Sequence, residues 1–224
     1  MSAPVASEAP AQPGRDCPGC PRLVAFRRDN RTIYPDFHNA PVASFGPLDA
    51  RLLVVGLAPG LKGANKTGRP FTGDYAGDLL YATLIGYGFA RGTYAARPDD
   101  GVALVDCRIT NAVRCVPPEN KPTGPEVKAC RDFLAGELAG LPRLAAVLAL
   151  GAVAHKAVLA ALGERQAAHS FAHGARHALG GGLLLADSYH CSRYNTNTGR
   201  LTRPMFESVF DGLRAHLEPP PDGD

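Results

Sequence analysis

Two stretches of the chain carry side chains that could act on a small ligand. The first, GLAPGLKGANKTGRPFTGD over residues 56–74, contains five glycines and the cations Lys62 and Lys66, and it directly follows the apolar run LLVV. The second, SYHCSRYNT over residues 188–196, places an imidazole, a guanidinium, a phenol and an amide within seven residues. A histidine in such company is a better candidate for chemistry than a histidine alone. The two stretches therefore predict a ligand site.

The glycine-rich stretch suggests phosphate binding first, because backbone N–H groups and the dipole of a following helix both favour an anion. Its spacing fits neither the dinucleotide fingerprint G-x-G-x-x-G nor the order of residues in a P-loop. A site for a nucleoside triphosphate is therefore disfavoured. A surface loop whose glycines only provide positive φ angles is the simple alternative.

Strands and helices in alternation must position these stretches. Short apolar runs predict buried parallel strands, and the segments between them predict helices. We expect strands over residues 51–56, 102–107, 144–151 and 181–188, and helices over 74–87, 124–139, 152–162 and 202–217. This alternation is typical of an α/β fold, here a three-layer α/β/α sandwich with a central, mainly parallel four-stranded sheet. Ligands of such folds bind beyond the carboxyl ends of the strands.

Length and composition favour one globular domain. The chain has 224 residues, of which 45% are hydrophobic and 20% charged, and these values exclude a disordered or fibrous protein. Residues 1–15 and 218–224 show no apolar period and contain many Pro and small or acidic residues. We expect both to be disordered tails, which leaves a single domain over residues 16–217.

The formal net charge of +3 is too small to prove a nucleic-acid partner. A local cluster of Lys and Arg could still form a phosphate-binding face. The first residues lack the basic start and the continuous apolar core of a secretory signal, and no run approaches the roughly 18 apolar residues of a membrane span. We expect a cytoplasmic protein without a membrane partner.

Three separated motifs make the chain recognisable. They are GLAPG with GRPFTGD, then ITNAVRC, and later HCSRYNTNTGRLT. In this order they resemble the uracil-DNA glycosylase superfamily, most closely the B-type enzymes called family 5, from about Cys17 to His216. The resemblance implies a monofunctional DNA glycosylase that hydrolyses the N-glycosidic bond of uracil and of other deaminated bases, such as hypoxanthine and xanthine, in DNA. No obligate protein partner is expected, and we expect a monomer.

The resemblance also assigns roles around the base. A damaged base must leave the helix stack before its glycosidic bond can be reached, and stacking on an aromatic ring replaces about 1–3 kcal/mol per base. By resemblance, Phe71 stacks on the base, Asn111 reads its pyrimidine edge, and His190 polarises a carbonyl as negative charge develops there. A core role for Phe71 and a turn role for Asn111 are the plain alternatives. Further base contacts are expected from Gly56, Leu57, Ala58 and Gly60.

The attacking water lacks its usual partner in the first motif. Most families of the superfamily place Asp, Asn or Glu at one of two positions that are Leu57 and Ala58 in this chain, and the apolar pair is the pattern of family 5. The nearest carboxylate of the motif is Asp74, which the resemblance also suggests as catalytic. Asp74 stands immediately before a predicted helix, so an N-cap is its other possible role.

Basic and polar side chains near the two stretches are expected to hold the duplex. Exposed cations are commonly just solvated, and a salt titration of DNA affinity would separate the two cases. The expected DNA-binding residues are Lys66, Arg193, Tyr194, Asn195 and Arg200.

Four of the six cysteines have the spacing of metal ligands. Cys17 and Cys20 form a C-x-x-C, and Cys115 and Cys130 flank a Pro-rich loop. The residues alone allow either a tetrahedral zinc ion or an iron–sulfur cluster. The resemblance implies a [4Fe-4S] cluster on these four thiolates. Cys107, in a predicted strand, and Cys191 are not expected to be ligands.

Two other functions compete with the glycosylase. A catalytically weak protein of the same fold could bind damaged DNA, and the apolar pair in the first motif favours it, whereas the intact GRPFTGD and His190 do not. A zinc enzyme needs an open coordination position, which four cysteine ligands would close.

Overall fold

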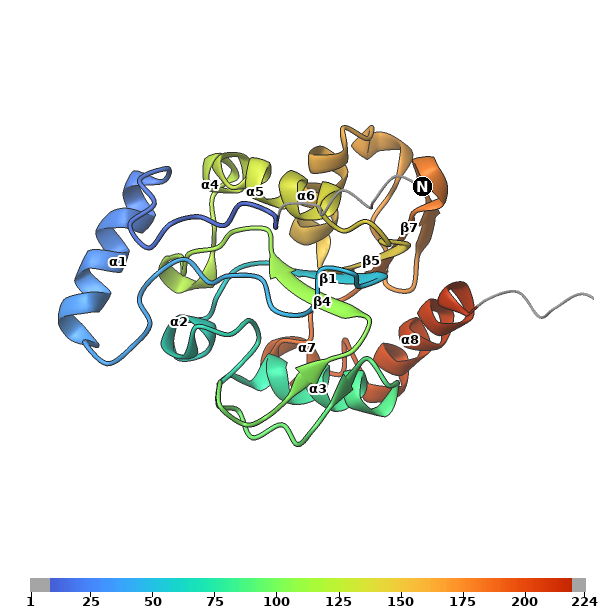
Figure 1. Cartoon of the computed structure of the whole chain (residues 1–224), viewed down its shortest axis with the longest axis horizontal. Coiled ribbons are helices and arrows are strands. Elements are labelled where there is room, and N and C mark those ends of the chain that lie inside the picture. The colour runs from blue at the N-terminus through green and yellow to red at the C-terminus, as the bar shows by residue number, and fades with distance from the viewer. Residues whose placement is uncertain (1–8, 219–224) are drawn as a thin grey trace, which may run out of the picture.

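The structure is a computed structural model that describes residues 9–218. Its centre is a five-stranded sheet of order β4-β1-β5-β7-β6, in which β6 runs antiparallel to β7 and the other pairs are parallel (Figure 1). In chain order these strands are β1 (Leu52–Gly56), β4 (Cys107–Asn111), β5 (Ala146–Leu150), β6 (Arg176–Ala178) and β7 (Leu184–Ser188). Every residue of the four parallel strands is buried, because helices cover both faces of the sheet.

Helices form the two outer layers (Figure 1). The longer ones are α1 (Pro21–Ile33), α3 (Tyr75–Gly86), α5 (Arg131–Ala139), α6 (Ala152–Leu162) and α8 (Arg203–Leu217), and the shorter ones are α2 (Ala64–Thr67), α4 (Gly124–Ala129) and α7 (Arg193–Asn197). Apolar residues of α3 and α8 pack with alternate strand residues in one core, and those of α5 and α6 pack with the others in a second core. The predicted three-layer α/β/α sandwich with a mainly parallel sheet is therefore confirmed.

The strand count and one strand position were wrong. The sheet has five strands rather than four, because β6 reads RHA with both end residues exposed and so carries no apolar run. The run over 102–107 does not form a central strand: β3 (Ala103–Leu104) pairs with β2 (Ala90–Arg91) in a separate small sheet. The central strand β4 follows it and contains Arg108, whose buried guanidinium pairs with Glu137. A strand residue whose burial depends on an ion pair with a distant helix has no signal in a hydrophobicity pattern.

The helices and termini also differ in detail. The helix expected over 124–139 divides at Cys130 into α4 and α5. Part of the expected N-terminal tail is ordered: the side chain of Gln12 donates to the Glu137 carboxylate at 2.9 Å and accepts from Arg114 at 3.0 Å. The expectation of a disordered tail is therefore wrong for this segment, because a buried charge network recruits it. Residues 1–8 and 219–224 lie outside the described residues.

Within residues 9–218, no helix combines the length and apolar character needed to cross a bilayer.

Candidate functional site

The carboxyl ends of the parallel strands open into a cavity of about 760 Å³. The register places Gly56 beside Asn111, and Leu150 beside Ser188, so the loops that follow these strands meet at one edge of the sheet. The lining residues come from the glycine-rich loop, the start of α3, the β5–α6 turn and the loop after β7. Among them are Leu57, Ala58, Gly60, Asp74, Gly151 and His190.

A recess of about 30 Å³ adjoins this cavity and shares Asp74 and His190 with it. Phe71 and Asn111 line the recess as well. The ring centroids of Phe71 and His190 lie 5.9 Å apart, with an angle of 28° between the ring planes. Three stretches that are far apart in the sequence thus place an aromatic ring, an amide, an imidazole and a carboxylate around one small space.

Gly56 makes room for this arrangement. A Cβ atom at this position would lie 2.4 Å from Asn111 Oδ1 and 2.5 Å from Phe71 Cζ. Any other residue at the end of β1 would therefore displace both side chains. Gly56 therefore does not line the recess, but leaves the space that Asn111 and Phe71 occupy.

Neighbouring side chains fix the backbone around Phe71. Phe71 is buried, and its backbone adopts a left-handed φ of 52°, which non-glycine residues rarely do. Tyr81 donates its hydroxyl to Pro70 O at 2.9 Å, and Tyr94 donates to Phe71 O at 3.1 Å. Arg69, two residues before Phe71, makes two 2.8 Å hydrogen bonds with the Asp100 carboxylate. The surrounding contacts thus impose a conformation that the residue would not adopt alone.

Asp74 precedes α3 at the N-cap position, but its side chain makes no capping hydrogen bond. Its Oδ1 atom is buried and has no hydrogen-bond partner among the described residues. Burial raises the pKa of this carboxyl, while the nearby backbone amides of Gly77 and Ala76 act in the opposite direction. Any capping by these amides is thus weak and can coexist with a role in chemistry, because the Oδ1 atom keeps no partner among the described residues.

The glycines of the loop surround this carboxylate. A Cβ atom would lie 2.9 Å from Asp74 Oδ2 at Gly60 and 2.2 Å from it at Gly63. Bare backbone can approach the carboxylate only because neither position carries a side chain. The surface-loop alternative for this stretch does not account for such close approaches.

His190 contributes a neutral imidazole. Loss of solvent around the ring lowers its pKa to about 4, so the ring is uncharged at neutral pH and carries one N–H donor. Asn195 donates its side-chain amide to His190 O at 2.8 Å. The buried Cys191 thiol donates to Ala76 O at 3.4 Å, which ties the loop to α3.

The expected DNA-binding residues are not all at the cavity. Arg193 lines it and lies over the Tyr75 ring, whereas Tyr194 is 71% exposed and is not among the lining residues. Asn195 instead supports the His190 backbone. Arg200 lies over the Tyr189 ring, and Lys66 over Phe37, and neither belongs to the residues that line the cavity.

Several lining residues were missed by the sequence analysis. Lys62 was noted only for its charge, whereas Asn120, Tyr75 and Val153 were not considered. Tyr75 and Val153 are partly exposed apolar side chains at the cavity, a combination that usually marks an interaction surface. Asn120 follows the Pro-rich PPE segment and adopts a positive φ of 58° in the structure, but nothing in the sequence marks it as a cavity residue.

The four candidate metal ligands lie near one another. Cys20, Cys115 and Cys130 pack in one small core around Leu23. Burial raises the pKa of Cys115 to about 12 and that of Cys20 to about 11, and charge on the neighbouring thiols, Cys17 included, adds to both shifts. Cys107 is buried in β4, away from this group.

Comparison with known proteins agrees with this geometry. Residues 43–214 match the family model of the uracil DNA glycosylase superfamily. The chain is 47% identical to the type-5 uracil-DNA glycosylase of Thermus thermophilus over 199 residues, which are 87% of this chain and 90% of that protein. It is 43% identical over 202 residues to the type-5 uracil-DNA glycosylase of Pyrobaculum aerophilum, covering 87% and 86%, and 39% identical to that of Mycobacterium bovis, covering 87% and 75%. The chain therefore belongs to the uracil-DNA glycosylase superfamily, alongside its type-5 members.

Proposed function

We propose that the protein excises uracil from DNA by hydrolysing the bond between the base and the deoxyribose. The observation that carries this proposal is the recess shared by Phe71, Asn111, Asp74 and His190 at the carboxyl edge of the sheet. These side chains supply a stacking surface, an amide for base recognition, a carboxylate and a neutral N–H donor. A protein that only bound DNA would have little use for all four in one enclosed space.

The chemistry follows from these groups. The extruded base stacks on Phe71, while Asn111 offers both a donor and an acceptor to its edge. As the bond from C1′ of the sugar to the base breaks, its electron pair moves onto the base, and His190 donates a hydrogen bond to the carbonyl oxygen that becomes negative. A water attacks C1′ and passes its proton to the Asp74 carboxylate. The products are a free base and an abasic site.

The substrate range is proposed to extend to hypoxanthine and xanthine. Leu57 and Ala58 line the cavity with apolar side chains and so present no polar group that selects one base edge. The cavity of about 760 Å³ beside the recess leaves space for a purine. We further propose that the protein acts as a monomer in the cytoplasm.

Duplexes that differ in a single base test the function. We expect incubation with uracil-containing duplex to produce alkali-labile abasic sites, and matched duplexes with hypoxanthine or xanthine to show the breadth. Tight binding of the uracil duplex without any cleavage after alkali treatment would instead support the damaged-DNA-binding alternative.

The rate of excision should decrease at acidic pH as the Asp74 carboxylate becomes protonated, which gives the pH–rate profile an acid limb. The carboxyl must be ionised to accept a proton, and its pKa is raised by burial, so the rate should fall as pH drops through that raised value. His190 stays neutral down to about pH 4, so it adds no inflection between about pH 6 and 8. Single-turnover rates followed from about pH 8 down to about pH 4 measure the limb. Asp78 raises the pKa of Asp74 through its charge, so Asp78→Asn should move the limb to lower pH.

We also propose that Cys17, Cys20, Cys115 and Cys130 hold a [4Fe-4S] cluster. All four cysteines lie in the described part of the chain, and no three of their sulfur atoms are within 4.8 Å of one another. Four thiolates on one zinc ion would stand about 3.8 Å apart, given Zn–S bonds of about 2.3 Å. The sulfur atoms of the four cysteines are thus spaced more widely than one zinc ion would hold them, and this spacing suits a multi-iron cluster better. When bound, such a cluster would cross-link the segment before α1 to the 115–130 loop.

Arg27 gives independent support for an anionic group here. Its guanidinium is 4% exposed, and it donates to Cys17 O at 2.9 Å and to Cys115 Sγ at 3.5 Å. Its Nε atom is buried without a partner, and no carboxylate lies within 4.0 Å of the guanidinium in the described part of the chain. A buried cation without an opposite charge beside it is costly, and thiolates carrying a metal cluster would supply the compensating charge.

Replacing Arg27 with glutamine should therefore weaken the cluster. We expect at least a roughly 10-fold faster loss of iron and sulfide under air, because the compensating cation is gone. Iron, sulfide and visible absorption of anaerobically purified protein provide the measurement. Arg28→Gln changes the exposed neighbour and is the matched control. Equal rates of loss for the two variants, or stoichiometric zinc in colourless wild-type protein, would contradict the proposal.

A further inference from the structure

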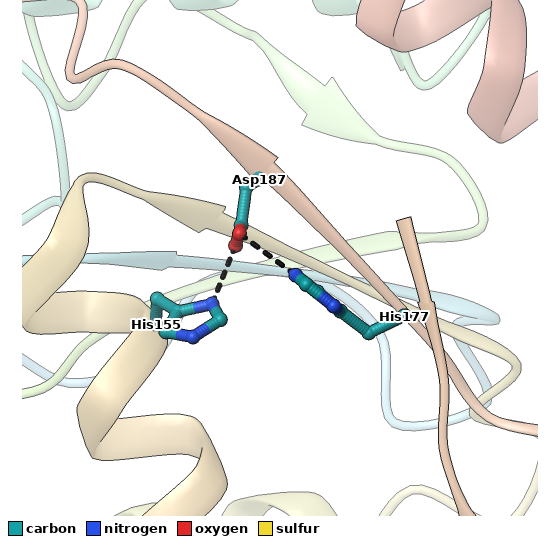
Figure 2. A group of neighbouring side chains, drawn as sticks. All are labelled: His155, His177 and Asp187. Carbon is teal, nitrogen blue, oxygen red and sulfur yellow. Dashed lines mark hydrogen bonds and ion pairs between the residues drawn. The ribbon is translucent and has the colours of Figure 1, made fainter. Parts of the chain in front are cut away.

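A second group of titratable side chains lies in the layer between the sheet and α6. Four of the seven histidines of the chain, His155, His169, His173 and His177, belong to this region. Two of them contact the buried carboxylate of Asp187 on β7 (Figure 2). His155 comes from α6 and His177 from the edge strand β6. The mechanism proposed for base excision uses none of these groups.

The donor atoms of three residues converge. His155 Nδ1 lies 2.8 Å from Asp187 Oδ1, and His177 Nε2 lies 3.0 Å from Asp187 Oδ2. All three donor atoms lie within 4.8 Å of one another. The side chains are 2%, 12% and 0% exposed for His155, His177 and Asp187, so the group is shielded from water. Figure 2 shows both rings directed at the same carboxylate from different elements.

The contacts of His155 call for either a second ring proton or a metal ion between its ring and Asp187. Its other nitrogen, Nε2, lies 2.9 Å from the backbone oxygen of His169. A carbonyl oxygen only accepts, so Nε2 carries the ring proton of a neutral imidazole and Nδ1 keeps a lone pair. That lone pair faces a carboxylate oxygen, which is repulsive unless a second proton or a metal ion lies between them. An imidazole that donates one N–H to a backbone carbonyl and offers its other nitrogen is the arrangement found around metal-bound histidines.

We propose that His155, His177 and Asp187 bind one divalent transition-metal ion of the Zn²⁺ type. Imidazole nitrogens and a carboxylate oxygen are ligands that zinc prefers, at about 2.0–2.2 Å. Tetrahedral ligands at this distance stand about 3.3 Å apart, so the observed separations of 2.8 and 3.0 Å need only a small expansion to admit the ion. Three protein ligands leave one coordination position for water.

The ion would join α6 to two strands, β6 and β7, that are already paired in the sheet. His155 lies on α6, His177 on the three-residue strand β6 and Asp187 on β7. The connection from α6 to β6 runs over residues 163–175 and forms only one short 3-10 helix, at Gln166–Ala168. Metal binding would hold this connection against the sheet. The site is therefore assigned a structural role, separate from the recess at the strand ends.

Zinc binding by the whole protein tests the site, with the anaerobically purified chain as the sample. We expect one zinc per chain in addition to any metal on the cysteines. The zinc K-edge spectrum should show nitrogen and oxygen ligands at about 2.0–2.2 Å and no sulfur near 2.3 Å. His177→Gln should weaken zinc binding at least about 100-fold, because it removes a direct ligand. His169→Gln keeps the backbone oxygen that His155 contacts and should bind zinc as the wild type does.

His177 lies on the partly exposed edge strand, so its replacement is expected to leave the protein folded, and circular dichroism verifies this. Failure of the folded wild type to bind zinc would overturn the proposal and leave a proton between His155 and Asp187. Zinc bound only through sulfur, or equal affinity of wild type and His177→Gln, would overturn it as well. None of these readouts depends on excision of a base, so the outcome is independent of the proposed function.

Discussion

Uracil excision by Asp74→Asn should be slower than wild type by about 10²–10⁴-fold in single-turnover measurements, the usual contribution of a general base. The amide has the size of the carboxylate but cannot accept a proton from water. The Oδ1 atom has no partner within residues 9–218, so little native structure depends on its charge. Affinity for uracil-containing duplex should stay close to that of wild type. Rate and affinity are measured on the same duplex, by quenched-flow cleavage and by fluorescence anisotropy.

Two further variants make this result specific. Asp78 is an exposed acid four residues further along, and Asp78→Asn should retain a near-normal rate at neutral pH. Gly63→Ala keeps Asp74 but places a Cβ atom 2.2 Å from its Oδ2, so it should slow excision by displacing the carboxylate. A normal rate for Asp74→Asn would reject the carboxylate as the base. Loss of duplex binding would show a structural role instead.

Asp100→Asn should lower the free energy of unfolding by about 3–5 kcal/mol, the usual effect of breaking a buried ion pair. Asp100 has no exposed side-chain surface, and it accepts hydrogen bonds from Arg69 and from the backbone amides of Ala95 and Val102. Without its charge, the guanidinium of Arg69 remains buried against the rings of Tyr81 and Tyr94. Because Arg69 lies next to Pro70 and Phe71, the loss should also loosen the base platform. Urea unfolding of wild type and variant measures the difference.

The Arg69–Asp100 pair should also make the free energy of unfolding depend on pH. The hydrogen bond from Arg69 holds the pKa of Asp100 below its ordinary value of 3.8. A lowered native pKa stabilises the fold above the unfolded value, and this contribution is lost as pH falls towards the native one. Wild type should therefore lose its advantage over Asp100→Asn as the medium becomes acidic. The neighbouring pair Arg97–Asp99 is 67% and 75% exposed, so Asp99→Asn should change stability by less than about 1 kcal/mol. Equal stability of the two variants at neutral pH would contradict this prediction.

The fold could be predicted from the sequence where the buried elements consist of apolar residues. Strands β1, β5 and β7 and helices α3, α6 and α8 follow such runs and were expected close to their observed bounds. Strand β4 was not, because its buried Arg108 depends on Glu137, a residue 29 positions away. The edge strand β6 gains its order from pairing with β7, and a three-residue strand carries too few side chains to show a pattern.

The candidate site was predictable where its residues stand in compact motifs. Phe71, Asp74 and His190 were expected from the loops that contain them, and the structure places them around one recess. The role of Asn195 as a support for the His190 backbone was not, because it depends on the short helix α7, which the polar sequence after His190 does not predict. Asn120 comes to the cavity from a separate Pro-rich turn. The His155–Asp187–His177 group joins three elements, and its spacing along the chain matches no motif.

The left-handed backbone at Phe71 has a consequence for engineering. A non-glycine residue in this region costs on the order of 1–3 kcal/mol, which the folded protein bears even without substrate. Glycine at this position would relieve that cost but would remove a buried aromatic side chain, a loss of about 3–5 kcal/mol, so screens for heat resistance should retain Phe71. Selection for a hardier protein should therefore preserve the stacking ring, so that stability and repair activity are selected together at residue 71.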